Sequence, residues 1–458
     1  MNQLLGSLLR LEPERLRRIF GIGLPIIGAM LSQSLINLID AAMVGRLGDA
    51  ALAAVGIGGY ASFVMVSMVM GLSAATQALI ARRQGAGDTD KIHQPLMAGL
   101  FFACAISIPL TLIFIGVAPW LMPALTDNPD VAAIAVPYFQ WRTAALIAVS
   151  MNFVYRGYWS GIGETRQYLM ILLAMHAINV SLSYVLVFGL PAIGVFGFEG
   201  WQGLGAVGSG IGTAMALVCG TAMYAWITFQ QHGHKLGRIE WPTRATLLQL
   251  NKLAWPNSLQ QTLFALGISV FFWIIGQIGT TEQAIGHILI SLQLVLILPA
   301  VGMGIAATSL VSHALGAGNK HDAHRWGWEV VRVASLVIAL IGVPLWLFPE
   351  WILQIFTNEP ELIAAGILPL QVTGIFIAFE VTAMVLTQAL LGAGASHKVM
   401  KINLAMQWCV FLPLAWVVGP MLGYGLLGVW ILQGLQRSAL SVIYSVIWQR
   451  RQWAHLKV

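Results

Sequence analysis

Charged residues are scarce in this chain. Asp, Glu, Lys and Arg make up only 9% of its 458 residues, whereas hydrophobic residues make up 58%. A soluble globular domain carries about 25% charged residues. The shortage excludes an ordinary soluble protein and predicts a polytopic membrane protein. The net charge of +6 does not indicate nucleic-acid binding, because the basic residues are spread through short loops.

Cysteine is equally rare. The three cysteines, Cys104, Cys219 and Cys409, lie in apolar runs and lack the spacing of a metal site. His232 and His234 are close in sequence but have no further ligands nearby. The chain also lacks a nucleophile elbow and a phosphate-binding loop in a suitable context. We therefore expect no disulfide, no metal or other cofactor, and no enzymatic activity.

Long apolar runs are what the chain has in abundance. A helix needs about 20 largely apolar residues to cross a bilayer. Twelve runs reach this length: 16–45, 52–81, 94–121, 132–158, 167–190, 206–229, 252–278, 284–313, 328–349, 361–390, 400–421 and 425–449. The sequence therefore predicts an all-α membrane protein with twelve transmembrane helices.

The longest charged loop divides these runs into two sets of six. We expect an N-lobe over residues 16–229, a linker over 230–251 and a C-lobe over 252–449. Residues 1–15 are amphipathic and rich in Arg, which is typical of an interfacial helix and not of a cleavable signal peptide. Residues 450–458 form a short tail.

Basic residues predict the orientation. If both termini are cytoplasmic, 21 of the 24 Lys and Arg residues fall on the cytoplasmic side. Short loops rich in Lys and Arg stay in the cytoplasm. We expect a monomer in the plasma membrane, the inner membrane of a bacterium, with both termini in the cytoplasm.

The two halves resemble each other at an offset of 231 residues. Pro25 matches Pro256, and residues 71–88 match 302–319 with six of eighteen positions identical. Because each half holds an even number of helices, both halves enter the membrane from the same side. Such parallel repeats place a cavity at their interface and favour alternating access. We therefore expect two pseudo-symmetric six-helix lobes.

Asp40 is the most informative single residue. It lies in an apolar run with Gln33 and Asn37 on the same helix face. A carboxylate at bilayer depth costs roughly 2.5–3.5 kcal/mol and marks an ion or proton pathway by default. The alternative is a carboxylate held in a structural hydrogen bond. We expect the face to line a polar cavity, with Gln33 and Asn37 contacting the transported compound.

Glu380 is a second acid within an apolar run, in the other half of the chain. Thr373 and Thr387 lie seven residues away on either side of it, in one stripe. It can attract a cationic substrate, or it can pair with Arg437, the only basic residue deep in a span. Both interpretations remain open from the sequence.

Two methionines are candidates for substrate contacts. Met65 and Met68 are three residues apart and share a helix face. Methionine makes soft, adaptable surfaces that suit promiscuous binding. Most such side chains simply pack in the core or face lipid, so this alternative also stays open.

Three segments carry a family resemblance. Residues 39–55, beginning Ile-Asp-Ala-Ala-Met-Val-Gly-Arg-Leu-Gly, resemble the first-helix signature of the multidrug and toxic compound extrusion (MATE) family. Residues 77–87 and 155–166 resemble the ends of the second and fourth helices of that family. The likeness covers essentially the whole chain and is closest to the DinF-like branch. It implies the MATE fold.

The resemblance assigns roles to individual residues. It implies that Pro25 is a hinge and that Asp40 is the essential acid of a coupling site. Asn179 and Thr213 match polar positions of this N-lobe site, and Ser183 stands where the branch usually has a second aspartate. We expect these residues, with His176 on the face of Asn179 and Ser183, to form one polar cluster. Glu380 resembles the C-lobe acid of the NorM-like branch.

Members of the family are secondary antiporters. The resemblance implies export of small amphiphilic, often cationic, organic compounds in exchange for H⁺ or Na⁺. Sodium prefers several oxygen ligands including carboxylates, and this site offers a single carboxylate, so we favour protons. A lipid-linked oligosaccharide flippase of the same superfamily is the alternative, although it would have two further helices and a more cationic cavity. A membrane scaffold would not explain Asp40 or Glu380.

Overall fold

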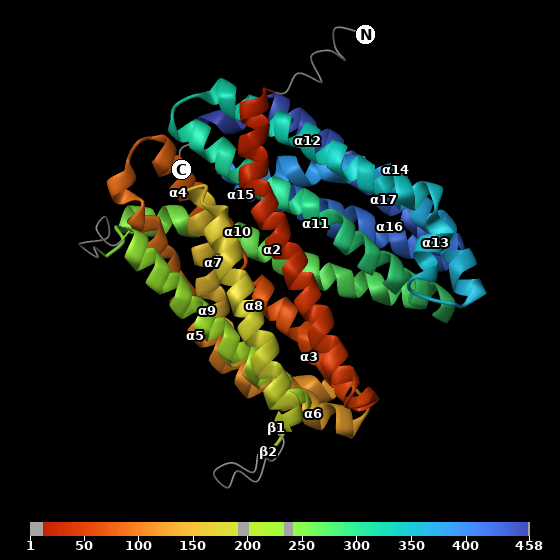
Figure 1. Ribbon diagram of the computed structural model, residues 1–458. Helices are drawn as coiled ribbons and strands as arrows, with labels where there is room; N and C mark the ends of the chain where they lie inside the picture. Colours follow the sequence, from red (N-terminus) through yellow and green to blue (C-terminus); the bar gives the residue numbers. More distant parts are fainter. Residues whose placement is uncertain (1–11, 191–200, 233–240, 457–458) are drawn as a thin grey trace.

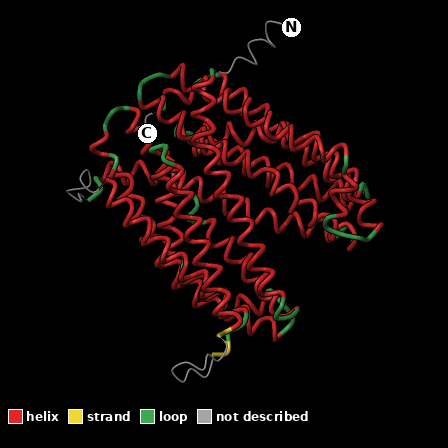
Figure 2. The backbone as a smooth tube through the Cα atoms, viewed as in Figure 1, coloured by secondary structure: helices red, strands yellow, loops and turns green. Residues whose placement is uncertain are grey.

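The computed structural model describes residues 12–190, 201–232 and 241–456. These residues are almost entirely helical (Figure 2). Two short strands, β1 (Gly189–Leu190) and β2 (Trp201–Gln202), form an antiparallel pair. The helices gather into two lobes that are joined at one end and spread apart at the other (Figure 1).

The N-lobe is built from the first half of the chain. Its helices are α2 (Pro13–Gly45), α3 (Asp49–Ser67), α4 (Gly71–Gly85), α5 (His93–Ala124), α6 (Pro129–Ala144), α7 (Leu146–Gly161), α8 (Thr165–Phe188) and α9 (Ala206–His232), with a 3₁₀ turn, η1 (Thr89–Lys91).

The C-lobe follows the same plan. Its helices are α10 (Arg244–Gly276), α11 (Thr280–Gly316), α12 (Lys320–Leu347), α13 (Pro349–Gln354), α14 (Pro360–Gly392), α15 (Ser396–Leu404), α16 (Leu412–Trp416) and α17 (Gly425–Gln449), with π-helical turns η2 (Ala405–Phe411) and η3 (Val417–Met421) and a 3₁₀ turn, η4 (Gln452–His455).

The predicted all-α architecture is confirmed. Within the described residues, eleven helical stretches are long and apolar enough to cross a membrane, and the bent pair α6–α7 makes a twelfth. Several predicted boundaries differ by a few residues from those of the structure, and two differences concern the start of a lobe. Helix α10 begins at Arg244, inside the predicted linker, because the Thr243 hydroxyl caps it by accepting from the Thr246 amide at 3.3 Å. Helix α2 begins at Pro13, and residues 1–11 of the predicted interfacial helix lie outside the described residues.

The first helix of each half crosses to the other lobe. Ile19, Ile22 and Ile26 at the start of α2 pack in the hydrophobic core of the C-lobe, whereas Ala29 belongs to the core of the N-lobe. Leu250 and its neighbours at the start of α10 pack in the N-lobe core in the same way. The sequence boundary between the lobes is therefore not the boundary between the hydrophobic cores.

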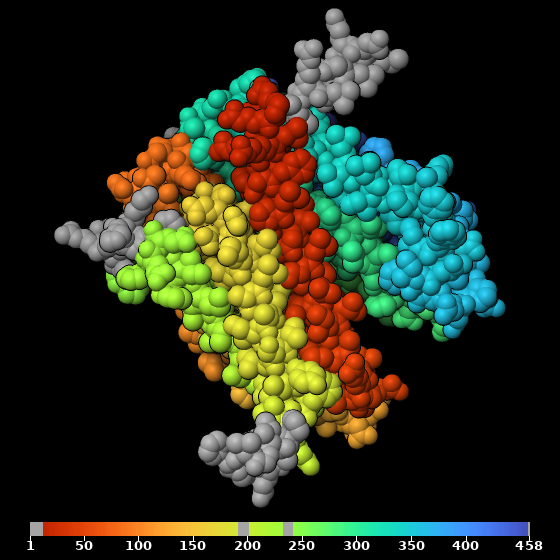
Figure 3. All heavy atoms as spheres, in the orientation of Figure 1, coloured from red at the N-terminus to blue at the C-terminus, as the bar shows by residue number. Residues whose placement is uncertain are grey.

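The backbones of the two lobes approach each other closely at a pair of glycines. A methyl group on Gly85 would collide with the carbonyl oxygen of His313, and one on Gly316 would collide with that of Arg82. These two contacts are related by the 231-residue repeat, because 82 + 231 = 313 and 85 + 231 = 316. We call this the joined end. At the opposite, open end the lobes separate, with α6 and the strands on one side and α13 on the other (Figures 1 and 3).

Candidate functional site

A cavity of about 520 Å³ lies between the two lobes. This is the size of a pocket for a drug-sized molecule, roughly 300–1,000 Å³. The N-lobe contributes side chains from α2, α3, α4 and α7, and the C-lobe contributes most of the lining, from α10, α11, α14, α15, η2 and α17. Phe271, which occupies the position of Asp40 in the second repeat, lines the cavity against Phe411.

Carboxamides dominate the polar part of the lining. Eight glutamines and two asparagines face the cavity, against three charged side chains: Arg156, Glu380 and Arg437. Gln260 has a buried side-chain oxygen without a hydrogen-bond partner among the described residues. The cavity therefore offers many neutral donors and acceptors and few charges.

Glu380 is buried and already paired. Its side chain is 4% exposed, and one carboxylate oxygen accepts a hydrogen bond from Gln293 Nε2 at 3.0 Å. The other oxygen lies 3.6 Å from Arg437 Nη1. Glu380 therefore faces the cavity, as attraction of a substrate would require, and it also pairs with Arg437, as the structural interpretation predicts. Thr373 does not join it but accepts from Trp430 Nε1 at 3.0 Å.

Asp40 lies outside this cavity, in the N-lobe. One of its carboxylate oxygens is buried without a hydrogen-bond partner among the described residues. Arg142 of α6 acts on it electrostatically, but no ion pair joins the two in the described part of the chain. A buried oxygen without a donor is expensive for an ionised carboxylate and is readily satisfied by a proton or a cation.

The predicted polar cluster is present without Asp40. Asn179 Nδ2 donates to the Thr213 hydroxyl at 3.1 Å, and the Ser183 hydroxyl donates to Asn179 Oδ1 at 3.3 Å. The expectation that these residues bond to Asp40 is not met, since no hydrogen bond among the described residues joins them to it. They connect α8 to α9, whereas Asp40 is on α2.

His176 connects a second network to α2. Its Nδ1 lies 2.7 Å from the Ser32 hydroxyl and its Nε2 lies 3.2 Å from Gln33 Oε1. Gln33 Nε2 in turn donates to Asn37 Oδ1 at 3.2 Å. Gln33 and Asn37 do share a face with Asp40, but both are exposed and neither lines the cavity. Their contact with the transported compound stays a prediction, and it is not made through the lining of this cavity.

The predicted role of Met65 and Met68 is also not supported. Met65 is fully buried in the N-lobe core, and neither side chain reaches the cavity. The methionines that do line it are Met30, Met70 and Met384. Substrate contact by Met65 and Met68 therefore stays a prediction without support from the lining of this cavity.

Sequence reasoning missed the residues that join the lobes beneath the cavity. Gln77 Nε2 donates to the Ile305 carbonyl at 2.7 Å and to the Ser309 hydroxyl at 2.8 Å. The Ser309 hydroxyl donates to the Ser160 carbonyl at 2.6 Å. The signal was present, because Gln77 and Ser309 both lie in the repeated segments 71–88 and 302–319.

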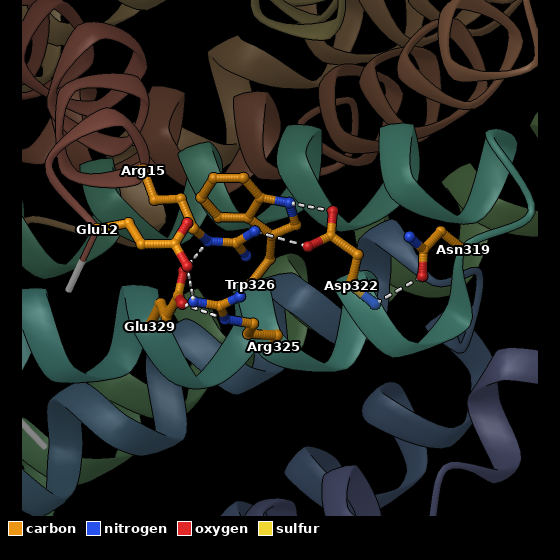
Figure 4. Close-up of polar contacts among 7 residues, drawn as sticks. All are labelled: Glu12, Arg15, Asn319, Asp322, Arg325, Trp326 and Glu329. Atoms are coloured by element: carbon orange, nitrogen blue, oxygen red, sulfur yellow. Dashed lines mark hydrogen bonds and ion pairs between the residues drawn. The ribbon is translucent and has the colours of Figure 1, made fainter. Parts of the chain in front are cut away.

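An ionic cluster lies at the joined end, between α2 and α12 (Figure 4). Arg15 pairs with Glu329 and also with Asp322, where Nη1 and Oδ1 are 2.6 Å apart. Its guanidinium lies over the Trp326 ring, 3.6 Å from the centroid. Arg325 reaches Glu329 at 2.8 Å. We call this cluster, with Glu12, which pairs with Arg325 at 2.7 Å, the α2–α12 latch.

The related junction in the other half contains hydrogen bonds from Arg83 and no ion pair among the described residues. Thr246, which matches Arg15 in the repeat, receives a hydrogen bond from Arg83 Nη2 at 2.9 Å. Gln94, which matches Arg325, accepts from Arg83 at 3.1 Å. The joined end is therefore held by one ionic junction and one hydrogen-bonded junction.

Among the described residues, no group of three His, Cys, Asp or Glu side chains is placed to hold a metal ion.

Comparisons with known proteins identify the family. The MatE family model matches residues 25–185 and 256–417, once in each repeat. The probable multidrug resistance protein NorM of Bradyrhizobium diazoefficiens is 30% identical, over 90% of this chain and 88% of its own, and that of Thermotoga maritima is 25% identical, over 96% and 94%. A solved structure described as an outward-facing conformation of a multidrug resistance MATE family transporter has a TM-score of 0.84 at 21% identity, covering 97% of both chains. The chain therefore belongs to the MATE family of membrane transporters.

Proposed function

We propose that this protein is a secondary antiporter that exports small amphiphilic organic compounds by alternating access. The observation that carries the proposal is Asp40, a half-buried acid within a candidate membrane span, one of whose oxygens is buried without a hydrogen-bond partner among the described residues. The cavity between the lobes supplies a place for the compound. The names of the NorM relatives support drug efflux in particular.

Protons are the proposed coupling ions. Burial in an apolar surrounding favours the neutral form of a carboxyl group, which suits exchange of one proton. A sodium ion needs several oxygen ligands. Asn179, Ser183 and Thr213 bond to one another and not to Asp40, so no carboxylate joins their cluster. Sodium coupling is the second possibility to be tested.

Alternating access explains the shape of the molecule. The lobes are closed at the end that carries Arg82, Arg83 and the start of α2, and the basic residues at this end support a cytoplasmic location for it. The structure then represents an outward-open state. The α2–α12 latch and the Gln77 contacts are the interactions that must break before the cavity can open to the cytoplasm.

The test is transport in proteoliposomes under an imposed proton gradient and, separately, an imposed sodium gradient. We expect the proton gradient to drive export and Asp40→Asn to abolish it. Asp49→Asn, which removes an exposed acid at the start of α3, is the matched control and should transport normally. Active export by Asp40→Asn would overturn the proposal. Export driven by the sodium gradient alone would replace the proton with sodium.

A flippase would transport a different kind of compound, a lipid-linked sugar. A lipid-linked sugar enters sideways from the bilayer and carries a phosphate-bearing headgroup. If the reconstituted protein moves a fluorescent lipid-linked sugar between leaflets and exports no soluble amphiphile, the drug-efflux proposal is wrong. The twelve candidate spans favour the antiporter, because the flippases are expected to have two more.

A further inference from the structure

The charges that line the cavity do not match an organic cation. Two arginines, Arg156 and Arg437, face it, against a single acid, Glu380. The remaining polar lining is neutral, mostly carboxamides. With ordinary ionisation the lining therefore carries a net charge of +1, from 2 − 1. An organic cation would meet a surplus of positive charge.

The single acid is already neutralised. Glu380 holds Gln293 on one oxygen and Arg437 near the other. A cation that used Glu380 would have to displace Arg437, whose Nε is buried without a partner among the described residues. Leaving a second guanidinium group unpaired at bilayer depth is unfavourable. The Glu380–Arg437 pair therefore contributes little net attraction for a positive ligand.

Arg156 provides the uncompensated charge. It comes from α7, and its Nε donates to the Ser73 hydroxyl at 2.9 Å. Its guanidinium lies 5.0 Å from the centroid of the Phe153 ring. Among the described residues no acidic side chain forms an ion pair with it. The planar guanidinium group is suited to binding a carboxylate through parallel hydrogen bonds.

We infer that the cavity takes amphiphiles that carry a carboxylate, as anions or zwitterions, with Arg156 binding the acid group. Gln260, Gln433 and Gln436 then supply neutral hydrogen bonds to the rest of the molecule, and Phe271 and Phe411 supply apolar contact. The inference rests on the proposed efflux function and specifies its substrate class. It also limits the expectation that substrates are often cations.

The test uses two forms of one xanthene dye, the free carboxylic acid and its methyl ester, which is a cation of nearly the same shape. Binding to the purified protein is followed by fluorescence anisotropy. We expect the acid to bind at least about tenfold more tightly, the size of one charge-assisted hydrogen bond. Arg156→Gln should remove this preference, and Arg156→Lys should retain part of it. Lys401→Gln, which removes an exposed charge outside the cavity, should leave the preference unchanged.

Each outcome decides the inference. Equal binding of the two dyes, tighter binding of the ester, no binding of either dye, or an unchanged preference in Arg156→Gln would overturn it. If Arg156→Gln does not fold, the wild-type preference and Arg156→Lys still decide. Transport in proteoliposomes is measured separately. Preferential binding of the acid without gradient-driven export of either dye would reject the antiporter proposal while supporting the assignment of the cavity.

Discussion

At the scale of single residues, the acids Glu380 and Asp40 lie in different lobes and in different surroundings. The two acids lie on helices that are not equivalent in the repeat, since Asp40 corresponds to Phe271. Glu380 faces the cavity and has two partners, whereas Asp40 lies outside it with an unsatisfied oxygen. This separation suits one site for the transported compound and another for the proton.

Glu380→Gln should change selectivity and not abolish transport. The substitution releases Arg437 from the one ion pair that it makes among the described residues and raises the positive charge of the cavity. We expect weaker binding and export of the cationic dye ester, stronger binding of the acid form, and little change for a neutral compound. Dye binding and export in the same proteoliposomes measure this. An equal loss for all three compounds would instead indicate a structural role for Glu380.

Gly85→Ala should disturb the joined end. A methyl group there collides with the His313 carbonyl, and overpacking of this kind costs about 1–3 kcal/mol. The lobes must separate slightly, so we expect a lower melting temperature and a larger fraction of molecules open at this end. Gly45→Ala is the control, because nothing lies within 4 Å of the added methyl group. Unchanged stability and transport in Gly85→Ala would show that the backbone at this contact can move to accommodate the methyl group at no cost.

At the scale of helices, α2 is the element that connects the two lobes. Its first turns pack in the C-lobe core and its later turns in the N-lobe core. Pro25 lies inside α2, within the part that packs in the C-lobe core, since Ile26 after it also belongs to that core, and it removes one backbone hydrogen bond from the helix. Helix α2 nevertheless runs as one helix from Pro13 to Gly45. Bending at Pro25 therefore remains a prediction.

Pro25→Ala should slow transport without unfolding the protein. Restoring the backbone hydrogen bond stiffens α2 a few residues before Ala29, where the helix joins the N-lobe core. We expect a lower rate of gradient-driven export, with dye binding and melting temperature equal to or above those of the wild type. Stopped-flow transport and a thermal melt measure the two quantities. A wild-type rate would argue against a hinge at this residue.

The α2–α12 latch should stabilise the joined end. Arg15→Gln leaves Asp322 without its guanidinium partner, while Arg325 still holds Glu329. We therefore expect the free energy of unfolding to fall by less than the roughly 3–5 kcal/mol that is typical when a buried charge loses its partner. Arg17→Gln removes an exposed charge on the same helix and serves as the control. Equal melting temperatures for the two variants would show that the α2–α12 latch does not stabilise the folded protein.

The Glu12–Arg325 ion pair of the α2–α12 latch is sensitive to acid. A hydrogen bond from Arg325 holds the pKa of Glu12 below its ordinary value. A carboxyl group with a lowered pKa in the folded state stabilises that state at neutral pH, and this contribution is lost as the pH falls through the lowered value. Acidification therefore weakens the Glu12–Arg325 ion pair.

At the scale of the whole molecule, the sequence predicts the helices well and the cavity poorly. Apolar runs and the repeat are local or periodic signals, so twelve spans and two lobes follow from them. The cavity is assembled from helices far apart in sequence, and single residues such as Gln436 or Arg156 carry no local sign of facing it. Pairing patterns such as Gln77 with Ser309 also require the packed lobes. The crossing of α2 and α10 onto the opposite lobes is likewise a property of tertiary packing.

Access to the cavity should switch sides when the latch is removed. Gln436 lines the cavity, and a cysteine placed there, in a chain whose three native cysteines are replaced by serine, reports the side from which it is reached. In the wild-type background an impermeant thiol reagent should label it from the outside. With Arg15→Gln the joined end is weaker, and labelling from the cytoplasmic side should increase, while Arg17→Gln should leave the pattern unchanged. Labelling from the cytoplasm alone in the wild-type background would reverse the assigned orientation and contradict the outward-open state.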